Sequence, residues 1–571
     1  MKKTNKLLAQ ILALMLSVGS VASLGACGNS YQSGEQIDPN RTQLYVFNFA
    51  GGFGVDWLKS VKSRYEELHK NDKYEEGKEG IQIYITNEKQ AASELMSKIL
   101  DDREEVYFTE GGSYYALKNA GVLKDITTAV TGVSAYESVT VESKLTAEQQ
   151  AFYGIEEGGK KHYYALPHYA AYYGLTYNID LFEDKDYYFA ADTSEYEISG
   201  NVEDLFVSNL NPGKSVGIDG IPNTTDDGLP TTYEEFFILC DRIKGDGNIP
   251  LLWTGHNYKD YITAFMNSLV TDYEGLDNMM KHYTYEGTVD NLGTIVNGEF
   301  VKDAQPTRIT PSNGYELARQ ESKYLALEFI RKMITTDGYS GRLCFNSSYW
   351  HYDAENTFLK AGVYEKTTPA AMLLDGVWWQ EEARATFNEM IDAKGDNYSQ
   401  KNRRFGFMPL PKANQEKVDE ARTEKLSQTL YNAQNSIAFV KKNIADWKLP
   451  IALDFMQFVN TQASLVEFTT ITGTTKALNY SLSTDEKNAL SPYGRSVLEL
   501  QEKSEVVYPF SNKPIFVNNA SHFSTTALYK ISESQLYPAE GFHDYKSMTA
   551  AQWFTNMYNY NKNTRWGLLT Y

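Results

Sequence analysis

The stretch from Gln43 to Ala120 alternates short apolar runs with segments of helical periodicity, and this order constrains the fold more than any other feature of the chain. Strands are expected at Gln43–Phe47, Ile81–Ile85 and Val106–Phe108, with a helix after each. Because a βαβαβ order favours parallel strands joined by crossover helices, it predicts a mostly parallel sheet with helices on both faces.

The first of these helices shows the pattern most clearly. Asp56 can cap it, and its apolar positions share one face. These positions are Trp57, Val61, Tyr65 and Leu68.

Ligands of such sheets bind beyond the carboxyl ends of the strands. Here those ends lead into Asn48–Gly52 and Thr109–Gly112, so Asn48 and Glu110 are candidate ligand-binding residues. Both side chains also suit helix capping at a strand–helix turn, and this alternative stays open.

A chain of 571 residues is too long for one compact core, so two large lobes or more are expected. Further strand-like segments lie at 163–167 and 172–178. A polar insertion follows at about 187–230, and helical signals resume at Thr232. Cys240 lies in an apolar helical stretch and is expected to be a buried, inert thiol.

The sharpest local signal is Asp375-Gly376-Val377-Trp378-Trp379, which follows an apolar run. Adjacent residues at a helix start point in different directions, so one Trp can pack inward while the other faces a cleft. Asp375 is a candidate for binding a ligand, or for holding the Gly376 turn. Trp253 also follows a strand, and a core role suits it as well as a cleft role.

An acidic loop from 219 to 228 offers several oxygen ligands of the kind that calcium prefers. It does not match the EF-hand spacing, so a solvated turn is the alternative to a structural Ca²⁺. The candidate ligands are Asp219, Asn223, Asp226 and Asp227.

Several enzyme motifs are missing from the sequence. Gly52-Phe53-Gly54 suggests a dinucleotide fingerprint, but Trp57 occupies the third glycine position. No HExxH, GxSxG or CxxC is present, and no cofactor is required by any motif. A pair of opposed carboxylates, as in glycosidases, is not excluded by the sequence.

The N-terminal 26 residues are typical of a secretory signal peptide. Lys2, Lys3 and Lys6 precede an apolar stretch that ends at Leu24. The following Gly25-Ala26-Cys27 completes a resemblance to a bacterial lipobox, which implies cleavage before Cys27, lipidation of Cys27 and anchoring to the outer face of the cytoplasmic membrane. A single transmembrane helix is the alternative. Residues 28–41 are expected to form a flexible stalk.

The net charge and the aromatic content of the chain limit the classes of molecule that it is expected to bind. The formal net charge of −20 argues against binding to nucleic acid or to an anionic membrane surface. The 42 Tyr and 8 Trp are a mild hint of sugar binding, because these side chains combine a flat apolar face with a polar edge.

Six segments, taken in order, resemble the extracellular solute-binding proteins of ABC importers, in the carbohydrate-binding branch that is similar to maltose-binding protein. Each segment is weak alone, but their order spans nearly the whole chain. They are the lipobox, Phe47–Gly54, Gly174–Asn178, Pro230–Phe236, Ala371–Trp379 and Phe405–Pro411.

The resemblance implies a two-lobe α/β fold of the periplasmic-binding-protein type, with a ligand cleft between the lobes. The first lobe would comprise residues 42–170 plus 430–485, and the second 171–429 plus 486–571, with insertions near 187–230 and 275–320. It also implies a monomer that delivers an oligosaccharide to an ABC permease and is not an enzyme. A glycan-cleaving enzyme and a receptor for peptides or another non-sugar solute stay open as alternatives.

Overall fold

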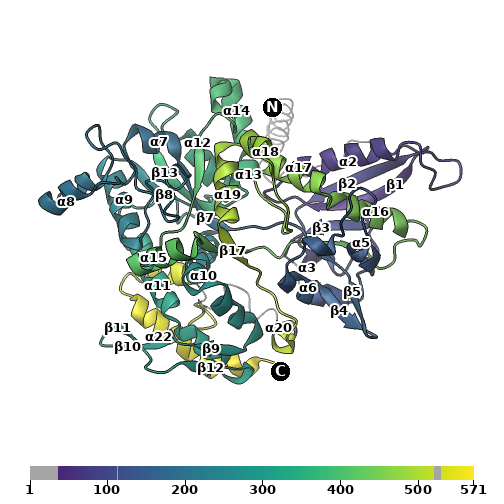
Figure 1. Ribbon diagram of the computed structural model, residues 1–571. Coiled ribbons are helices and arrows are strands. Elements are labelled where there is room, and N and C mark those ends of the chain that lie inside the picture. The colour runs from purple at the N-terminus through teal and green to yellow at the C-terminus, as the bar shows by residue number, and fades with distance from the viewer. Residues whose placement is uncertain (1–35, 112–113, 520–528, 536, 571) are drawn as a thin grey trace, which may run out of the picture.

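The computed structural model describes residues 36–111, 114–519, 529–535 and 537–570. The predicted signal peptide, the predicted lipidation site Cys27 and most of the predicted stalk lie outside these residues. Two α/β lobes lie side by side, each built around its own sheet, with extended segments crossing between them (Figure 1). The predicted fold class is confirmed.

The sheet of the first lobe has the order β2-β1-β3-β16-β6. β1 pairs in parallel with β2 and β3, whereas β16 runs antiparallel to β3 and β6. The predicted parallel arrangement of the first three strands is therefore confirmed. The strands are β1 (Thr42–Phe49), β2 (Ile81–Glu88), β3 (Val106–Thr109), β6 (Leu166–Pro167) and β16 (Ile437–Val440).

Helices from both ends of the lobe's sequence cover this sheet. They are α2 (Asp56–Leu68), α3 (Ala92–Leu95), α4 (Tyr114–Asn119), α5 (Thr127–Thr131), α6 (Ala147–Tyr153), α16 (Leu449–Val459) and α17 (Gln462–Thr472). A short 3₁₀ helix (Glu142–Lys144) and a hairpin of β4 (Gly154–Glu157) and β5 (Lys160–Tyr163) complete the lobe.

Two details of α2 differ from the sequence prediction. Asp56 is the first helical residue and caps nothing, because Val55 occupies the N-cap position. Leu68, at the last turn, is 56% exposed, whereas Trp57, Val61 and Tyr65 are buried. The buried face of the helix thus ends one turn earlier than its apolar pattern predicts.

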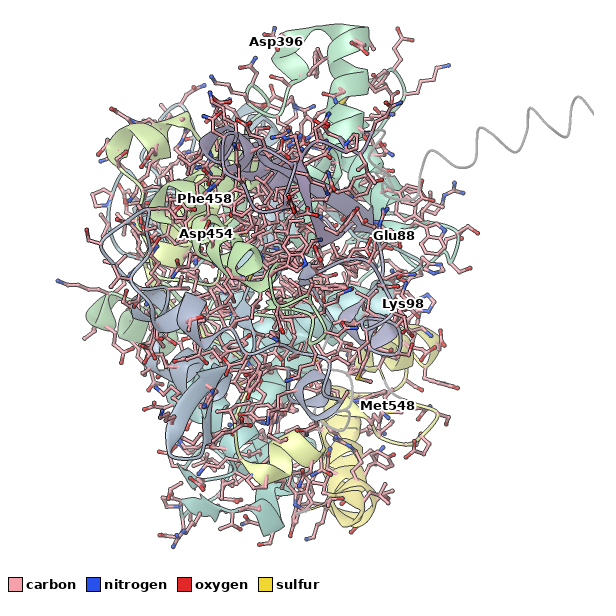
Figure 2. All side chains as sticks on the ribbon, turned by 90° about the vertical axis from the view of Figure 1, so that its right-hand side faces the viewer. Glu88, Lys98, Asp396, Asp454, Phe458 and Met548 are labelled. Atoms are coloured by element: carbon pink, nitrogen blue, oxygen red, sulfur yellow. The ribbon has the colours of Figure 1, made fainter. Side chains whose placement is uncertain are left out.

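Helix α16 holds α2 in place although about 390 residues separate them in sequence. The hydroxyl of Tyr65 donates to Asp454 Oδ2 over 2.8 Å. The ring of Phe458, one turn further along α16, packs against the Tyr65 ring at 5.2 Å between centroids. Figure 2, which faces the first lobe, shows Asp454 and Phe458 close together on this side.

The sheet of the second lobe has the order β14-β7-β13-β8. β13 runs parallel to β8 and antiparallel to β7, and β14 runs antiparallel to β7. All seven residues of β13 are buried, which explains its unbroken apolar sequence. The strands are β7 (Tyr173–Asn178), β8 (Ile249–Leu252), β13 (Ala370–Gly376) and β14 (Phe405–Met408).

The second lobe carries most of the helices. They are α7 (Ile179–Asp184), α9 (Tyr233–Gly245), α10 (Tyr258–Thr284), α11 (Glu321–Thr335), α12 (His351–Lys360), α13 (Trp379–Glu382), α14 (Arg384–Lys394), α15 (Gln415–Glu424), α18 (Thr484–Ala489), α19 (Pro492–Glu502), α20 (Pro514–Asn518), α21 (Pro538–Asp544) and α22 (Ala550–Tyr560). Helix α14 projects from the top of this lobe in Figure 1, and Asp396 lies near its tip in Figure 2. Cys240, on α9, is fully buried and free, as predicted.

The two predicted insertions form small substructures on the second lobe. Residues 187–230 contain α8 (Ser194–Ser199) and a 3₁₀ turn (Val202–Leu205). Residues 275–320 form two strand pairs and a 3₁₀ segment, near the C-terminal helices. Their members are β9 (Gly287–Val289), β10 (Gly293–Val296), β11 (Glu299–Lys302), β12 (Thr307–Ile309) and Pro311–Arg319.

The segments that cross between the lobes are hydrogen-bonded to one another. The amide of His168 donates to Ser436 O at 3.1 Å, and the amide of Ala433 donates to Ala171 O at 2.8 Å. A third segment joins them where the amide of Ala170 donates to Thr475 O at 3.2 Å. Beside them, β15 (Gln428–Tyr431) pairs with β17 (Ser504–Val507). In the described part of the chain, no helix is long and apolar enough to cross a membrane.

Candidate functional site: a cavity between the lobes

The carboxyl ends of β1, β2 and β3 meet the second lobe where β13 ends. Because Phe49 lies opposite Glu88 in the parallel register, the loops after these strands emerge together at one edge. A cavity of about 140 Å³ lies there. The first lobe lines it with Phe49, Gly51, Gly52, Phe53, Lys89, Glu110 and Tyr169, and the second lobe and crossing segments with Tyr173, Asn257, Tyr261, His351, Trp378, Glu382 and Gln434.

Aromatic rings from both lobes form one part of the wall. Trp378 packs edge-to-face against Tyr173, with ring centroids 5.0 Å apart. On its other side it meets Phe53 of the first lobe at 6.2 Å. Trp378 is 7% exposed and lines the cavity together with Phe53 and Tyr173. Such a wall offers flat apolar faces to a guest.

Glu110 places a carboxyl group in the cavity, directly after β3. The hydroxyl of Tyr169 donates to its Oε2. Burial raises the pKa of Glu110 to about 7, against the opposing effects of the Tyr169 hydrogen bond and of Lys89. The carboxyl group of Glu110 therefore gains and loses its proton much nearer to neutral pH than an exposed glutamate does.

A second acidic group borders the cavity on the side of the second lobe. Glu382 lines it, and His351 Nε2 lies 3.3 Å from Glu382 Oε1. Burial opposes the charged form of Glu382, but the hydrogen bond and charge of His351 outweigh it and hold the pKa below its usual range. For Asp375, burial and then the charge of Glu382 raise the pKa well above its usual range.

Only two of the six predicted ligand-binding residues, Glu110 and Trp378, line the cavity. Asp375 is 2% exposed and accepts the Gly376 amide at 2.7 Å, so it holds the turn and lies behind the wall. Asn48 lines a much smaller adjoining hollow, and its amide donates to Asn87 Oδ1 at 2.6 Å and to Gly54 O at 3.2 Å. It holds the turn after β1.

Trp253 and Trp379 do not reach the cavity. Both are completely buried. Trp253 donates its indole N–H to Cys344 O at 2.8 Å, which satisfies its polar edge inside the second lobe. Trp379 packs against Phe405 at 5.1 Å. Of the two adjacent Trp, Trp378 lines the cavity, and its contact with a ligand stays a prediction.

Several lining residues were missed by the sequence analysis. A signal existed for Lys89, because it directly follows β2 and so lies at the edge where ligands bind. A signal also existed for Tyr169, because it lies in a segment that leads from the first sheet to the second. No local pattern marks Tyr261, in the first turn of α10, or His351, the first residue of α12.

The acidic loop of the 187–230 insertion is held by hydrogen bonds and one ion pair. Asp226 Oδ2 accepts the amide of Ile218 at 2.8 Å, and Asp227 Oδ2 accepts the amide of Asn223 at 2.6 Å. Asp219 pairs with Lys503 Nζ at 2.6 Å. Among the described residues no group of three or more His, Cys, Asp or Glu side chains is placed to hold a metal ion. The calcium site stays a prediction.

Gly52 and Trp378 bring the two lobes into direct contact. A Cβ atom built on Gly52 would lie 2.2 Å from Trp378 Cδ1, far inside van der Waals contact. At the rim, Arg384 of α14 pairs with Asp56 of α2, which adds a second link between the lobes. These two contacts hold the lobes together beside the cavity, and they have to part before a guest larger than the cavity can enter.

We expect Gly52→Ala to hold the lobes apart. Overpacking a tight site costs about 1–3 kcal/mol, and here opening the cleft relieves it. The radius of gyration from small-angle scattering should rise in the variant, and binding of any guest that needs the closed form should weaken about tenfold. Gly245→Ala is the matched control, because its Cβ would meet open space. Scattering and affinity equal to those of the unchanged protein would contradict the expectation.

Two lobes, each with a sheet whose strand ends face a shared cavity, define the fold of the solute-binding proteins. No protein-family model matches the sequence, and no curated protein matches it. Solved structures of sugar-binding proteins do share the fold.

RafE in complex with raffinose is 12% identical, with a TM-score of 0.50 over 91% of this chain and 99% of that one. RafE in its apo form comes from Streptococcus pneumoniae. Maltose-bound MalE3 of T. maritima is 11% identical, with a TM-score of 0.50 over 90% of this chain and 98% of that one. A protein from a study of xylan utilization by Caldanaerobius polysaccharolyticus is 11% identical, with a TM-score of 0.51 over 90% of this chain and 98% of that one. These likenesses show the fold.

Proposed function

We propose that this chain is a lipid-anchored substrate-binding protein that holds an oligosaccharide between its lobes and delivers it to an ABC transporter permease. The observation that carries the proposal is the cavity between the two sheets, lined by aromatic rings and carboxyl groups from both lobes. The fold is shared with RafE bound to raffinose and with maltose-bound MalE3, which supports a sugar as the guest.

The chemistry of the wall suits a sugar. A sugar ring has an apolar face, which can stack on Trp378, and a belt of hydroxyl groups, which can donate to Glu110 and Glu382. Hydrogen bonds to carboxylates are stronger than those between neutral groups, and exclusion of water strengthens them further.

The size of the cavity supports a hinge mechanism. Pockets that hold drug-sized ligands are about 300–1,000 Å³, so 140 Å³ is too small for an oligosaccharide without opening of the lobes. Closure around the guest then changes the outer shape of the molecule. A permease that binds the closed shape better than the open one can read the presence of the guest.

One experiment tests the receptor against its alternatives. The protein is screened by thermal shift with pools of oligosaccharides and of peptides, because a guest that binds only the folded state stabilises it by about 2.7 kcal/mol at a hundred times Kd. The proposal expects a rise in melting temperature with a sugar pool and no new reducing ends. New reducing ends would identify a glycan-cleaving enzyme instead. A rise with peptides alone would identify a receptor for a non-sugar solute.

The membrane anchor is tested at Cys27. In a bacterial host with lipoprotein processing, the unchanged chain should be found with the membranes and carry acyl chains detectable by mass spectrometry. Cys27→Ala should lose the acyl mass and move to the soluble fraction, because no thiol is left to carry the lipid. Membrane association of Cys27→Ala without a lipid would argue for an uncleaved apolar segment. The purified soluble form is expected to be a monomer in size-exclusion chromatography with light scattering.

A further inference from the structure

Two exposed aromatic rings lie beside the cavity, on the second lobe. The rings of His256 and Trp350 stack on each other, with centroids 3.3 Å apart and planes 20° from parallel. Both residues are exposed, and Trp350 is 38% exposed although its side chain is large and mostly apolar. We call this stacked pair of rings the aromatic platform.

The aromatic platform directly precedes two residues that line the cavity. His256 is followed by Asn257, and Trp350 is followed by His351. Consecutive Cα atoms are about 3.8 Å apart, so the platform begins one residue beyond the cavity wall. The topology explains this position. His256 lies in the loop after β8, and because β8 runs parallel to β13, the two strands end at the same edge of the sheet.

Contacts between two loops fix the aromatic platform in place. The amide of His256 donates to Tyr349 O at 2.8 Å, and His256 Nδ1 donates to Ser347 O at 2.7 Å. A Cβ atom on Gly255 would lie 2.4 Å from Asn346 O, so the loops approach this closely only because residue 255 is a glycine. The rings are therefore positioned before a guest arrives, which lowers the entropic cost of stacking on them.

A single exposed aromatic side chain is common on protein surfaces, and Trp447 is an example. It is 47% exposed. Its neighbour Lys448 pairs with Glu105, which precedes β3, so Trp447 lies at the edge of the first sheet opposite to the cavity. Trp350 differs from it in two ways, because a second ring stacks on it and because the next residue lines the cavity.

The size of the cavity leaves a role for a surface outside it. Its volume of about 140 Å³ is well below the range of about 300–1,000 Å³ for pockets that hold drug-sized ligands. When the lobes close in this form on one end of an oligosaccharide, the other sugar units have to lie outside the cavity. The aromatic platform offers such a unit a flat apolar face at the rim.

We propose that the aromatic platform is an outer subsite for a sugar unit beyond the cavity, so that the protein selects oligosaccharides by their length. The inference rests on the proposed function and deepens it. The cavity holds one end of the guest, the guest leaves it beside Asn257 and His351, and a later unit stacks on the exposed part of the Trp350 ring. Short sugars occupy the cavity alone and bind more weakly.

The test uses the full chain in a detergent without a sugar headgroup, because a maltoside can itself occupy a sugar site. Three ladders of defined length serve as probes: malto-oligosaccharides, xylo-oligosaccharides, and the series of raffinose, stachyose and verbascose. Calorimetry measures Kd for each member. In a ladder that binds, we expect the longest members to bind about tenfold more tightly than the shortest, the size expected for one added aromatic contact.

Variants separate recognition by the ring from a structural role. Trp350→Ala should raise Kd about tenfold for the longest members and leave Kd of the shortest within about twofold, because only the longest reach the ring. The start of α12 should persist, since Asp353 accepts the backbone amide of Trp350 at 2.9 Å and the indole takes no part. Trp350→Phe should recover part of the lost affinity. Trp447→Ala is the matched control and should change Kd at no length.

Oxidative footprinting locates the guest without any substitution. Hydroxyl radicals oxidise exposed Trp side chains, and mass spectrometry measures the oxidation of each one. At saturation, the longest members should protect Trp350 from oxidation and the shortest should not. Trp447 should be oxidised equally with and without a guest, because it lies at the opposite edge of the first sheet.

Failure of this inference can be distinguished from failure of the proposed function. Three results would overturn the outer subsite and retain the sugar receptor: a Kd that does not depend on length, a change in Trp350→Ala that is absent or equal at every length, and no protection of Trp350 by the longest bound member. An absence of binding by every member of the three ladders would count against both.

Discussion

Trp379→Ala is expected to lower the free energy of unfolding by about 3–5 kcal/mol, the range for removing a large aromatic side chain from a packed core. Trp379 is completely buried. Its ring is surrounded by Phe358 at 5.6 Å, Phe405 at 5.1 Å and Tyr493 at 5.5 Å between centroids. These neighbours come from three separate elements, so collapse around the vacated space is restricted.

Urea unfolding of the whole protein, followed by fluorescence and circular dichroism, measures this effect. Trp447→Ala is the matched control. Because Trp447 is 47% exposed, its substitution should lower the free energy of unfolding only slightly. At temperatures where Trp379→Ala is folded, its affinity for the guest should stay close to that of the unchanged protein. A loss below 1 kcal/mol in stability, or a loss of affinity without a loss of stability, would contradict the assignment of Trp379 to the core.

The order of strands in the first sheet was predictable because these strands are short runs that are apolar on both faces. The parallel pairing of β1, β2 and β3 follows from three such runs separated by helical segments. The ends of the helices were less predictable. Asp56 forms an ion pair with Arg384 of the other lobe instead of capping α2. No local sequence pattern predicts a partner more than 300 residues away.

The candidate site was predictable only in part. Strand ends pointed to Glu110, and the Asp375–Trp379 motif pointed to the wall of the cleft. The motif did not decide which Trp lines the cavity, since that depends on where α13 begins. Asn48 and Asp375 are polar residues at strand ends too, but their side chains stabilise turns. The Asn48 amide donates to a backbone carbonyl, and the Asp375 carboxyl group accepts a backbone N–H.

The cluster of carboxyl groups formed by Glu355, Asp375 and Glu382 depends on tertiary packing. Glu355 lies in a helix that begins at His351, and its sequence is that of an ordinary amphipathic helix. Only the packing of α12 against β13 brings Glu355 near Asp375 and Glu382. Strongly shifted pKa values, such as the raised values of Glu355 and Asp375, gather more often at functional sites than in structural cores.

Trp378→Ala is expected to weaken binding of the oligosaccharide that gives the largest thermal shift by about 2 kcal/mol or more, as truncation of a central aromatic contact does at binding sites. This corresponds to a rise in Kd of about thirtyfold. Trp378 is the one indole that lines the cavity among the described residues, and it contacts both lobes through Phe53 and Tyr173. Its removal deletes the face on which a sugar ring can stack and the contact that closes the cleft.

The two contributions of Trp378 can be told apart. Trp378→Phe keeps an aromatic face but is smaller, so it should recover part of the affinity, whereas Trp378→Leu fills space without a flat face and should not. Gly52→Ala keeps the indole in the protein but presses a methyl group against it, so its loss of affinity combines the cost of closure with displacement of the ring. If calorimetry shows the affinity of Trp378→Ala within twofold of the unchanged protein, the guest binds elsewhere and the cavity between the lobes is not the recognition site. If Trp378→Leu binds as well as Trp378→Phe, the indole acts by filling the space between Gly52 and Gly376, and recognition of the sugar falls to the carboxyl groups and tyrosines of the wall.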